Sequence, residues 1–165
     1  MNTDIINCYG TKLITFNCNI IKPLDLTNFV SLKKIKYPSN IELIQFPDGL
    51  EEIEFGIEFN SSIDNLPPNI KKIIFYPDSK FNQPLIKFFD GKNFYEAPEN
   101  NVNYFLGWPI NNLPTSLEEL QLGKHFSQSL DFLPESLKVL KIYSDKKLNL
   151  DNLPIGLEIL KVVKK

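Results

Sequence analysis

Residues 113–134 read LPTSLEELQLGKHFSQSLDFLP, and this pattern decides the fold. A Leu-Pro pair opens the unit, L-x-x-L-x-L follows, and an aromatic residue and a leucine come before the next Leu-Pro. The pattern recurs, and the prolines that open its units lie 20, 47, 20 and 20 residues apart: Pro47, Pro67, Pro114, Pro134 and Pro154. Such constant spacing is typical of a repeat protein, and the long gap predicts one insertion.

Each unit predicts one short strand and one corner. In L-x-x-L-x-L the last two leucines are two residues apart, so they share one face of a strand. Proline fixes φ and has no N–H, so Leu-Pro marks a corner outside the sheet. Gly56 and Gly123 follow their strands, where we expect a turn that needs a positive φ. The return segments lack a 3.6-residue period, so we expect extended arms rather than helices.

Stacked units can bury apolar residues that one unit of twenty leaves exposed. We therefore predict a mainly β fold, a leucine-rich-repeat-like solenoid of about 20-residue coils with a parallel β-sheet. The return arms should add apolar pairs to the core: Phe59 with Ile63, Phe81 with Leu85, and Phe126 with Leu130. The strands should add two inward rows: Ile35, Ile53, Ile73, Leu120, Leu140 and Leu160; and Tyr37, Phe55, Phe75, Leu122, Ile142 and Val162.

We expect a single repeat domain over residues 1–165. Residues 1–31 match the repeat loosely and should form a cap-like segment, in which residues 12–16 alternate as a strand does. Residues 32–81 and 113–165 are the repeats, and residues 82–112 are an insertion or a degenerate repeat. The last strand has no unit after it in this sequence, so its edge should be protected by lysines or should mediate self-association.

Composition excludes two kinds of partner. The net charge is −2 and all 18 basic residues are lysine, so neither arginine readout nor a basic excess supports nucleic-acid binding. No apolar run reaches membrane-spanning length, and no secretory leader follows Met1. The two cysteines, Cys8 and Cys18, are expected to be reduced thiols. We expect a cytoplasmic protein.

Catalytic chemistry has no visible basis in the sequence. His125 is the single histidine and is expected to be a loop side chain. There is no Gly-rich phosphate loop and no cluster with metal-ligand spacing. We therefore expect no enzyme activity, no catalytic residues, no cofactor and no metal.

Several units resemble the FNIP repeat, whose pattern is G-x-x-F-N-x-P-I-x-x-L-P. Residues 56–67 read GIEFNSSIDNLP, residues 81–85 read FNQPL, and residues 123–134 keep the pattern with serine at the Asn and Pro positions. The resemblance covers about residues 41–163. It implies a leucine-rich-repeat-like fold of the kind found in social amoebae and giant viruses, so the location would be the host cytoplasm if the protein is viral. Some family members carry an F-box and look like ubiquitin-ligase adaptors, but residues 1–31 do not read as an F-box.

Two regions are candidates for binding a protein. Residues 82–112 are rich in aromatic residues, which are either core of a degenerate coil or anchors on a protruding hairpin or loop: Phe94, Tyr95, Tyr104 and Trp108. Asp90-Gly91 there reads as a tight turn. The outward strand positions are either a solvated face held by charge pairs or a binding sheet. Candidate contacts there are Ile74, Tyr76, Glu119, Gln121, Val139, Lys141, Tyr143 and Ile159.

The sequence therefore predicts a non-catalytic protein–protein interaction module whose partner is unknown. Recognition would use the sheet face, the aromatic insertion or both. The alternatives are a structural or self-assembling component, for example of a viral particle, and the substrate-binding part of a ubiquitin-ligase adaptor that lacks its F-box.

Overall fold

The computed structural model describes residues 13–15, 26–27, 29–37, 45–89, 94–96, 108–144 and 146–164, with backbone alone for 13–15, 88–89, 94–96 and 108–110. No helix occurs in these ranges. The strands are β1 (Leu13–Thr15), β2 (Lys34–Tyr37), β3 (Glu52–Phe55), β4 (Lys72–Phe75), β5 (Ile86–Phe89), β6 (Phe94–Glu96), β7 (Trp108–Asn111), β8 (Glu119–Leu122), β9 (Val139–Tyr143) and β10 (Ile159–Val163).

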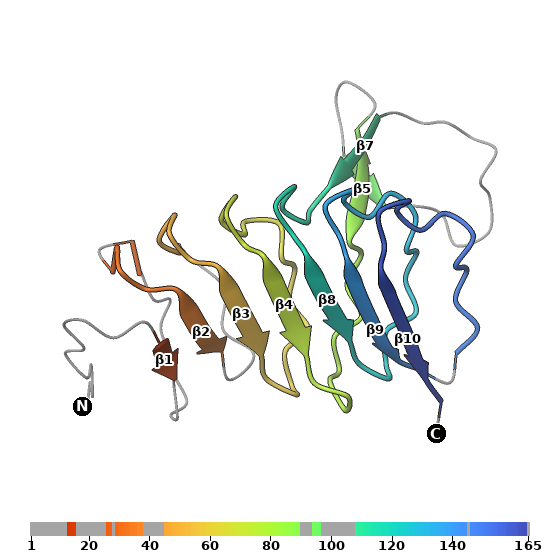
Figure 1. Cartoon of the computed structure of the whole chain (residues 1–165), viewed down its shortest axis with the longest axis horizontal. Helices are drawn as coiled ribbons and strands as arrows, with labels where there is room; N and C mark the ends of the chain where they lie inside the picture. Colours follow the sequence, from red (N-terminus) through yellow and green to blue (C-terminus); the bar gives the residue numbers. More distant parts are fainter. Residues whose placement is uncertain are drawn as a thin grey trace.

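Seven of these strands form one sheet in the order β1-β2-β3-β4-β8-β9-β10, and every neighbouring pair is parallel (Figure 1). The register joins equivalent repeat positions, so Ile73 of β4 lies opposite Leu120 of β8. Consecutive coils therefore stack through the same residues, as the constant proline spacing predicts. The predicted fold class, a mainly β solenoid with a parallel sheet, is confirmed.

The inward side chains of the sheet form the predicted rows. From β2 to β9 both rows are buried, and Ile53, Ile73 and Leu120 are 0% exposed. Burial on this scale contributes roughly 1.5–3 kcal/mol for each large apolar side chain. The rows open at the last strand, where Leu160 is 45% exposed and Val162 is 41% exposed.

Phenylalanines of the strands and the return arms stack through the core. Phe81 is fully buried and lies between Phe59 and Phe126, with ring centroids 6.1 and 6.2 Å away. It also stacks on Phe75 of β4 with a centroid distance of 3.8 Å. The predicted return-arm pairs are therefore core residues, and offset ring stacking joins each coil to the next.

A row of asparagine side chains ties the return arms together. Oδ1 of Asn60 accepts a 2.8 Å hydrogen bond from the backbone N–H of Asn82, one coil further along. Oδ1 of Asn82 in turn accepts a 2.8 Å bond from the backbone N–H of Ser127. The following Gln83 and Gln128 donate from Nε2 to the backbone oxygens of the same two asparagines. Because the return arms form no sheet, these side chains satisfy backbone groups that would otherwise have no protein partner.

The role expected for Gly123 needs correction. Its φ lies outside the left-handed region, so no positive φ requires glycine there. A Cβ at this position would lie 2.5 Å from the carbonyl oxygen of Tyr76 and 2.9 Å from Cβ of Ser79. Glycine is therefore needed because the neighbouring coil passes too close for a side chain. The positive φ among the described non-glycine residues belongs to Phe132, at 58°.

Strands β5, β6 and β7 lie outside the stack as a separate antiparallel sheet in the order β6-β5-β7, which projects from one side of the solenoid (Figure 1). β4 pairs directly with β8, so no degenerate coil lies between them. Leu85 and Leu113 are buried at the base, where the N–H of Asn112 donates to the oxygen of Leu85. Other coils place two residues at this corner, as between Leu130 and Leu133, whereas here the chain inserts residues 86–112.

Candidate binding surface

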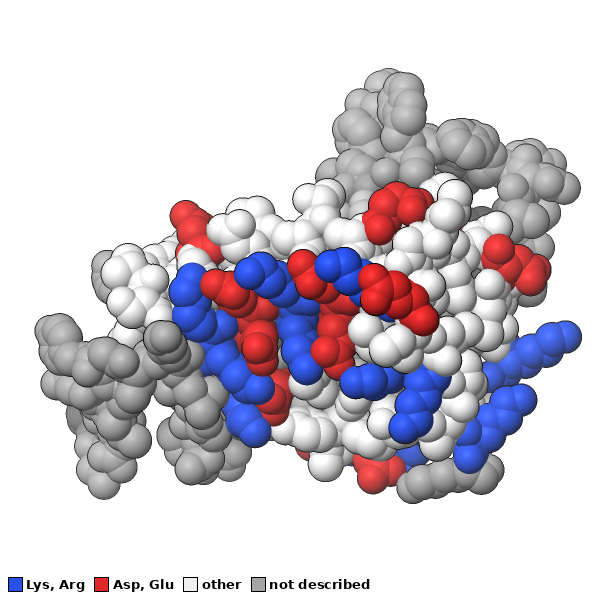
Figure 2. Space-filling view, in the orientation of Figure 1, with Lys and Arg blue, Asp and Glu red and all other residues white. Residues whose placement is uncertain are grey.

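The outward side of the parallel sheet, called here the outer face, carries interleaved lysines and glutamates over β2, β3, β4 and β8 (Figure 2). Glu54 accepts ion pairs from Lys34 at 2.6 Å and Lys36 at 3.0 Å. Glu119 is paired with Lys72 at 2.8 Å and Lys141 at 2.7 Å. The predicted pairing of charges on adjacent strands is therefore confirmed here, and each of the more exposed pairs contributes only about 0.2–1 kcal/mol.

Glu54 lies deeper than its outward position suggests. The residue is 7% exposed and accepts a 2.7 Å hydrogen bond from the hydroxyl of Tyr76 as well as the two lysine contacts. Burial alone would raise the pKa of Glu54, but the bonds from Lys34, Tyr76 and Lys36 outweigh burial and lower that pKa to about 2. The carboxylate is thus ionised and fully engaged, so it has little capacity left for a partner.

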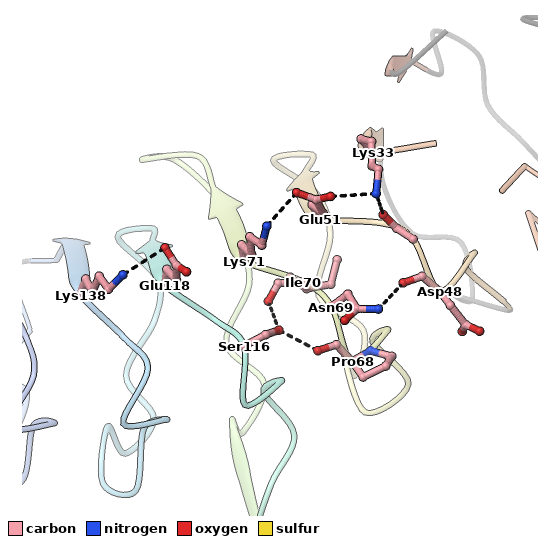
Figure 3. A network of polar contacts seen from close by, with 11 residues as sticks. Lys33, Asp48, Glu51, Pro68, Asn69, Ile70, Lys71, Ser116, Glu118 and Lys138 are labelled. Carbon is pink, nitrogen blue, oxygen red and sulfur yellow. Dashed lines mark hydrogen bonds and ion pairs between the residues drawn. The ribbon is translucent and has the colours of Figure 1, made fainter. Parts of the chain in front are cut away.

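A second row of alternating charges lies along the corners, at the residues that immediately precede the strands. In this row Glu51 bridges Lys33 at 2.8 Å and Lys71 at 3.0 Å, and Glu118 pairs with Lys138 at 3.5 Å (Figure 3). The lysine contacts lower the pKa of the Glu51 carboxyl. The hydroxyl of Ser116 donates a hydrogen bond to the preceding corner, where its Oγ lies 2.7 Å from the carbonyl oxygens of both Pro68 and Ile70. These contacts hold neighbouring corners in register.

The outer face changes character at β9 and β10. Val139 and Ile159 occupy the positions that carry Lys34, Glu52, Lys72 and Glu119 on the earlier strands. Ile159 is 51% exposed, and Val139 is half-buried beside it. Four residues further along the same strands are Tyr143 and Val163, which also pair in register. We call Val139, Tyr143, Ile159 and Val163 the apolar patch.

The structure brings only part of the predicted contact set together. Val139, Tyr143 and Ile159 lie in the apolar patch, and Lys141 lies within it but is paired with Glu119. Ile74 and Gln121 pair on β4 and β8, and Nε2 of Gln121 donates to the backbone oxygen of Phe75. Tyr76 is engaged by Glu54. Among the aromatic candidates, Phe94 and Tyr95 lie on β6 and Trp108 lies on β7, and the structure describes only their backbone. Tyr104 and the predicted Asp90-Gly91 turn lie outside the described residues.

The asparagine row and the burial of Glu54 were not predicted. The spacing between Asn60 and Asn82 was a usable signal for the first, because side chains at equivalent positions of stacked coils meet. His125 lies exposed on its turn. Within the described ranges no group of three or more His, Cys, Asp or Glu is placed to hold a metal ion. The same ranges contain no helix long and apolar enough to span a membrane.

The fold defines the class: the protein is a repeat protein built as a parallel β-solenoid. The family model named FNIP Repeat matches residues 109–145, from β7 through β8 and β9. This segment is thus an FNIP repeat, and the resemblance read from the motifs is confirmed over these residues. Comparison with curated protein sequences gives no match.

Proposed function

We propose that this chain is a non-catalytic module that binds a protein through the outer face of its sheet. The observation that carries the proposal is the replacement of paired charges by the apolar patch on β9 and β10. Covering exposed apolar surface stabilises a complex by about 25 cal/mol for each Å² removed from water. Docking over the paired charges on β2 to β8 would stabilise a complex less, because these charges would have to lose their water. A partner should therefore dock over β9 and β10.

The antiparallel sheet of residues 86–111 is a second part of the proposed recognition surface. It projects from the solenoid, and at its base the N–H of Asn112 donates to the oxygen of Leu85. Inserted segments of this length often carry function. Its aromatic residues on β6 and β7 would supply anchors for the same partner.

The experiment is capture of proteins from a lysate with three variants of the chain. The first carries Val139→Lys with Ile159→Lys and should lose the partner. The control carries Ile155→Lys, an identical change at a residue that is 99% exposed and lies on a corner outside the sheet. The third replaces residues 86–112 with Asp-Asn, the dipeptide at 64–65, and reports the contribution of the insertion.

A partner held by the wild type and the Ile155→Lys control, but lost by the double variant, supports recognition by the outer face. Binding by purified components must reproduce this difference. Equal retention by all variants would refute the proposed surface. Capture of ubiquitin-ligase subunits would favour the adaptor alternative, and capture of nothing but copies of this chain would favour the self-assembling one.

A further inference from the structure

Phe132 departs from the repeat at the corner that precedes β9. The residue before the Leu-Pro pair is asparagine on three described corners and phenylalanine on this one: Asn65, Asn112, Phe132 and Asn152. Phe132 is 51% exposed. An aromatic ring that stands half in water, at a position where the repeat has a polar side chain, is not explained by the packing of the coil.

The backbone of Phe132 is also unusual. Its φ of 58° lies in the left-handed region, where Cβ comes too close to the following carbonyl oxygen. Among the described residues none of the three equivalent asparagines has a positive φ, so the repeat itself does not require this conformation. Bulky residues rarely adopt it, and strain of this kind is concentrated at sites that have a function.

The exposure of Phe132 does not come from a missing neighbour in the stack. Its corner lies between two described corners, and side chains from both sides bond to it. Nδ2 of Asn111 donates a 2.6 Å hydrogen bond to the carbonyl oxygen of Phe132. Nδ2 of Asn152, on the next corner, donates a 2.8 Å bond to Oδ1 of Asp131. Phe132 is therefore exposed inside a stack that continues on both sides.

The Phe132 corner lies at the base of the projecting antiparallel sheet. Asn111, which bonds to Phe132, is the last residue of β7. The sheet projects from the side of the solenoid on which the parallel strands begin (Figure 1). The corner is therefore a surface distinct from the outer face.

The surface around Phe132 carries carboxylates without counter-charges. Residues 126–137 and 148–160 contain no lysine, arginine or histidine. Asp131 and Glu135 lie on the Phe132 corner and Asp151 lies on the next, and within the described ranges none of the three forms an ion pair. The enclosed glutamate of the outer face, in contrast, is paired with two lysines. A segment that brings positive charge is therefore complementary to this corner.

We propose that Phe132 anchors a basic, arginine-containing segment of a protein partner. The face of an aromatic ring attracts a cation, and a guanidinium can stack on a ring and donate to a carboxylate, here that of Asp131. Oδ1 of Asp131 accepts from Asn152 and Oδ2 accepts a 2.7 Å bond from Ser129, so the carboxylate is held in place. This inference goes beyond the proposed function, because the corner is not part of the outer face.

Short peptides with blocked ends test the proposal directly. The probes are GRGRG, GEGEG and GLGLG, which share their glycines and differ only in two side chains. Alternate side chains of an extended peptide point to the same side, so both arginines can face the corner. Each peptide is titrated into the isotope-labelled chain and followed by the NMR shifts of backbone amides. We expect GRGRG to shift amides within residues 129–136 and the other two peptides to leave them unchanged.

Variants of Phe132 separate the ring from the fold. Phe132→Leu keeps an apolar side chain but removes the aromatic face, so it should bind GRGRG about two- to fivefold more weakly than the wild type does. Phe132→Tyr is the control and should bind as the wild type does. Phe132→Asn should bind at least as weakly as Phe132→Leu. It should unfold at the urea concentration of the wild type or a higher one, because asparagine tolerates the left-handed conformation.

The two proposals can fail separately. Val139→Lys with Ile159→Lys leaves the Phe132 corner unchanged, so a captured partner that this double variant still holds would contradict only the proposed function.

Four results would overturn the inference. The first is the absence of any shift within residues 129–136 with GRGRG. The second is an equal shift with GEGEG or GLGLG, which would remove the role of positive charge. The third is an equal affinity of Phe132→Asn and the wild type for GRGRG. The fourth is unfolding of Phe132→Asn at a clearly lower urea concentration, because the ring would then serve the fold.

Discussion

The hydroxyl of Tyr76 donates a 2.7 Å hydrogen bond to Oε2 of Glu54, and this contact closes a carboxylate inside the outer face. Lys34 and Lys36 complete the enclosure. The result is one charged residue, on a face otherwise open to water, whose side chain is only 8% exposed. The stability of the solenoid should therefore depend on pH through this carboxylate more than through the other glutamates.

The pH dependence has a definite sign. Because the pKa of Glu54 falls from 4.5 to about 2 on folding, its stabilisation is complete above about pH 4.5 and is lost as the pH falls towards 2. The contribution at neutral pH is at most about 3 kcal/mol. Urea unfolding of the wild type and of Glu54→Gln between pH 7 and pH 2 should show a steep loss in the wild type and a shallower one in the variant.

The control for Glu54 is Glu52→Gln on the same strand. Its side chain is 40% exposed and pairs with Lys34 at 3.1 Å, so its removal should change the pH profile little. Identical profiles for the wild type and Glu54→Gln would show that the enclosed carboxylate does not govern acid unfolding.

The asparagine row predicts a cost for Asn82→Ala. The variant keeps its own N–H bond to Asn60 but leaves the N–H of Ser127 without its acceptor. Because this hydrogen bond is exposed to solvent, its loss should lower the free energy of unfolding by about 0.5–1.5 kcal/mol. Asn65→Ala is the control, because Asn65 is exposed on a corner and should tolerate alanine within about 0.5 kcal/mol. Equal effects of the two substitutions in thermal or urea unfolding would contradict a structural role of the row.

Two glycines provide a matched test of close approach. Gly123→Ala would place Cβ 2.5 Å from the oxygen of Tyr76, and the adjoining corner would have to move, at a cost of about 1–3 kcal/mol. At Gly156 the nearest atom to a Cβ is the oxygen of Glu135 at 3.4 Å, which is ordinary contact. Gly156→Ala should therefore be neutral or should stabilise the fold by up to about 1 kcal/mol. If Gly123→Ala unfolds at the same urea concentration as the wild type, the close approach has no energetic weight.

Equivalent leucines in one inward row should differ in their contribution. Leu120 is 0% exposed and Leu160 is 45% exposed, although both occupy the same position of the repeat. Leu120→Ala should cost about 2–5 kcal/mol, and Leu160→Ala should cost less than half of that. Both values come from urea denaturation at neutral pH. A loss at Leu160 as large as that at Leu120 would show that exposure of the side chain does not reduce its contribution.

The repeat pattern was sufficient to predict the solenoid and its inward rows. The reason is physical: L-x-x-L-x-L at a spacing of 20 residues can bury its leucines only when the coils stack in register. The charge pairs of the outer face were predicted for the same reason, since Lys34 and Glu52 occupy one repeat position. The repeat spacing therefore predicts a contact wherever residues at equivalent positions of neighbouring coils touch each other.

Features that break the period could not be derived in this way. The aromatic residues of 82–112 are compatible with the core of a degenerate coil or with a protruding segment, and the direct pairing of β4 with β8 was needed to show that no coil lies between these strands. Glu54 reads as one of several outward glutamates, and its burial depends on Tyr76, which lies beyond the next strand's end. The apolar patch was recognised from Val139 and Ile159, but its isolation from the paired charges required the structure.

The direct pairing of β4 with β8 also affects the order in which the solenoid can form during synthesis. Neighbouring strands such as β8 and β9 are 20 residues apart in the chain, but Lys72 and its partner Glu119 are 47 apart. At synthesis rates of about 5–20 residues per second, β4 emerges from the ribosome roughly 2–9 s before the strand that covers it. During that interval the ring of Phe81 lacks the cover of Phe126. The antiparallel sheet of β5, β6 and β7 is made of local pairings, so it can form while the solenoid is still incomplete.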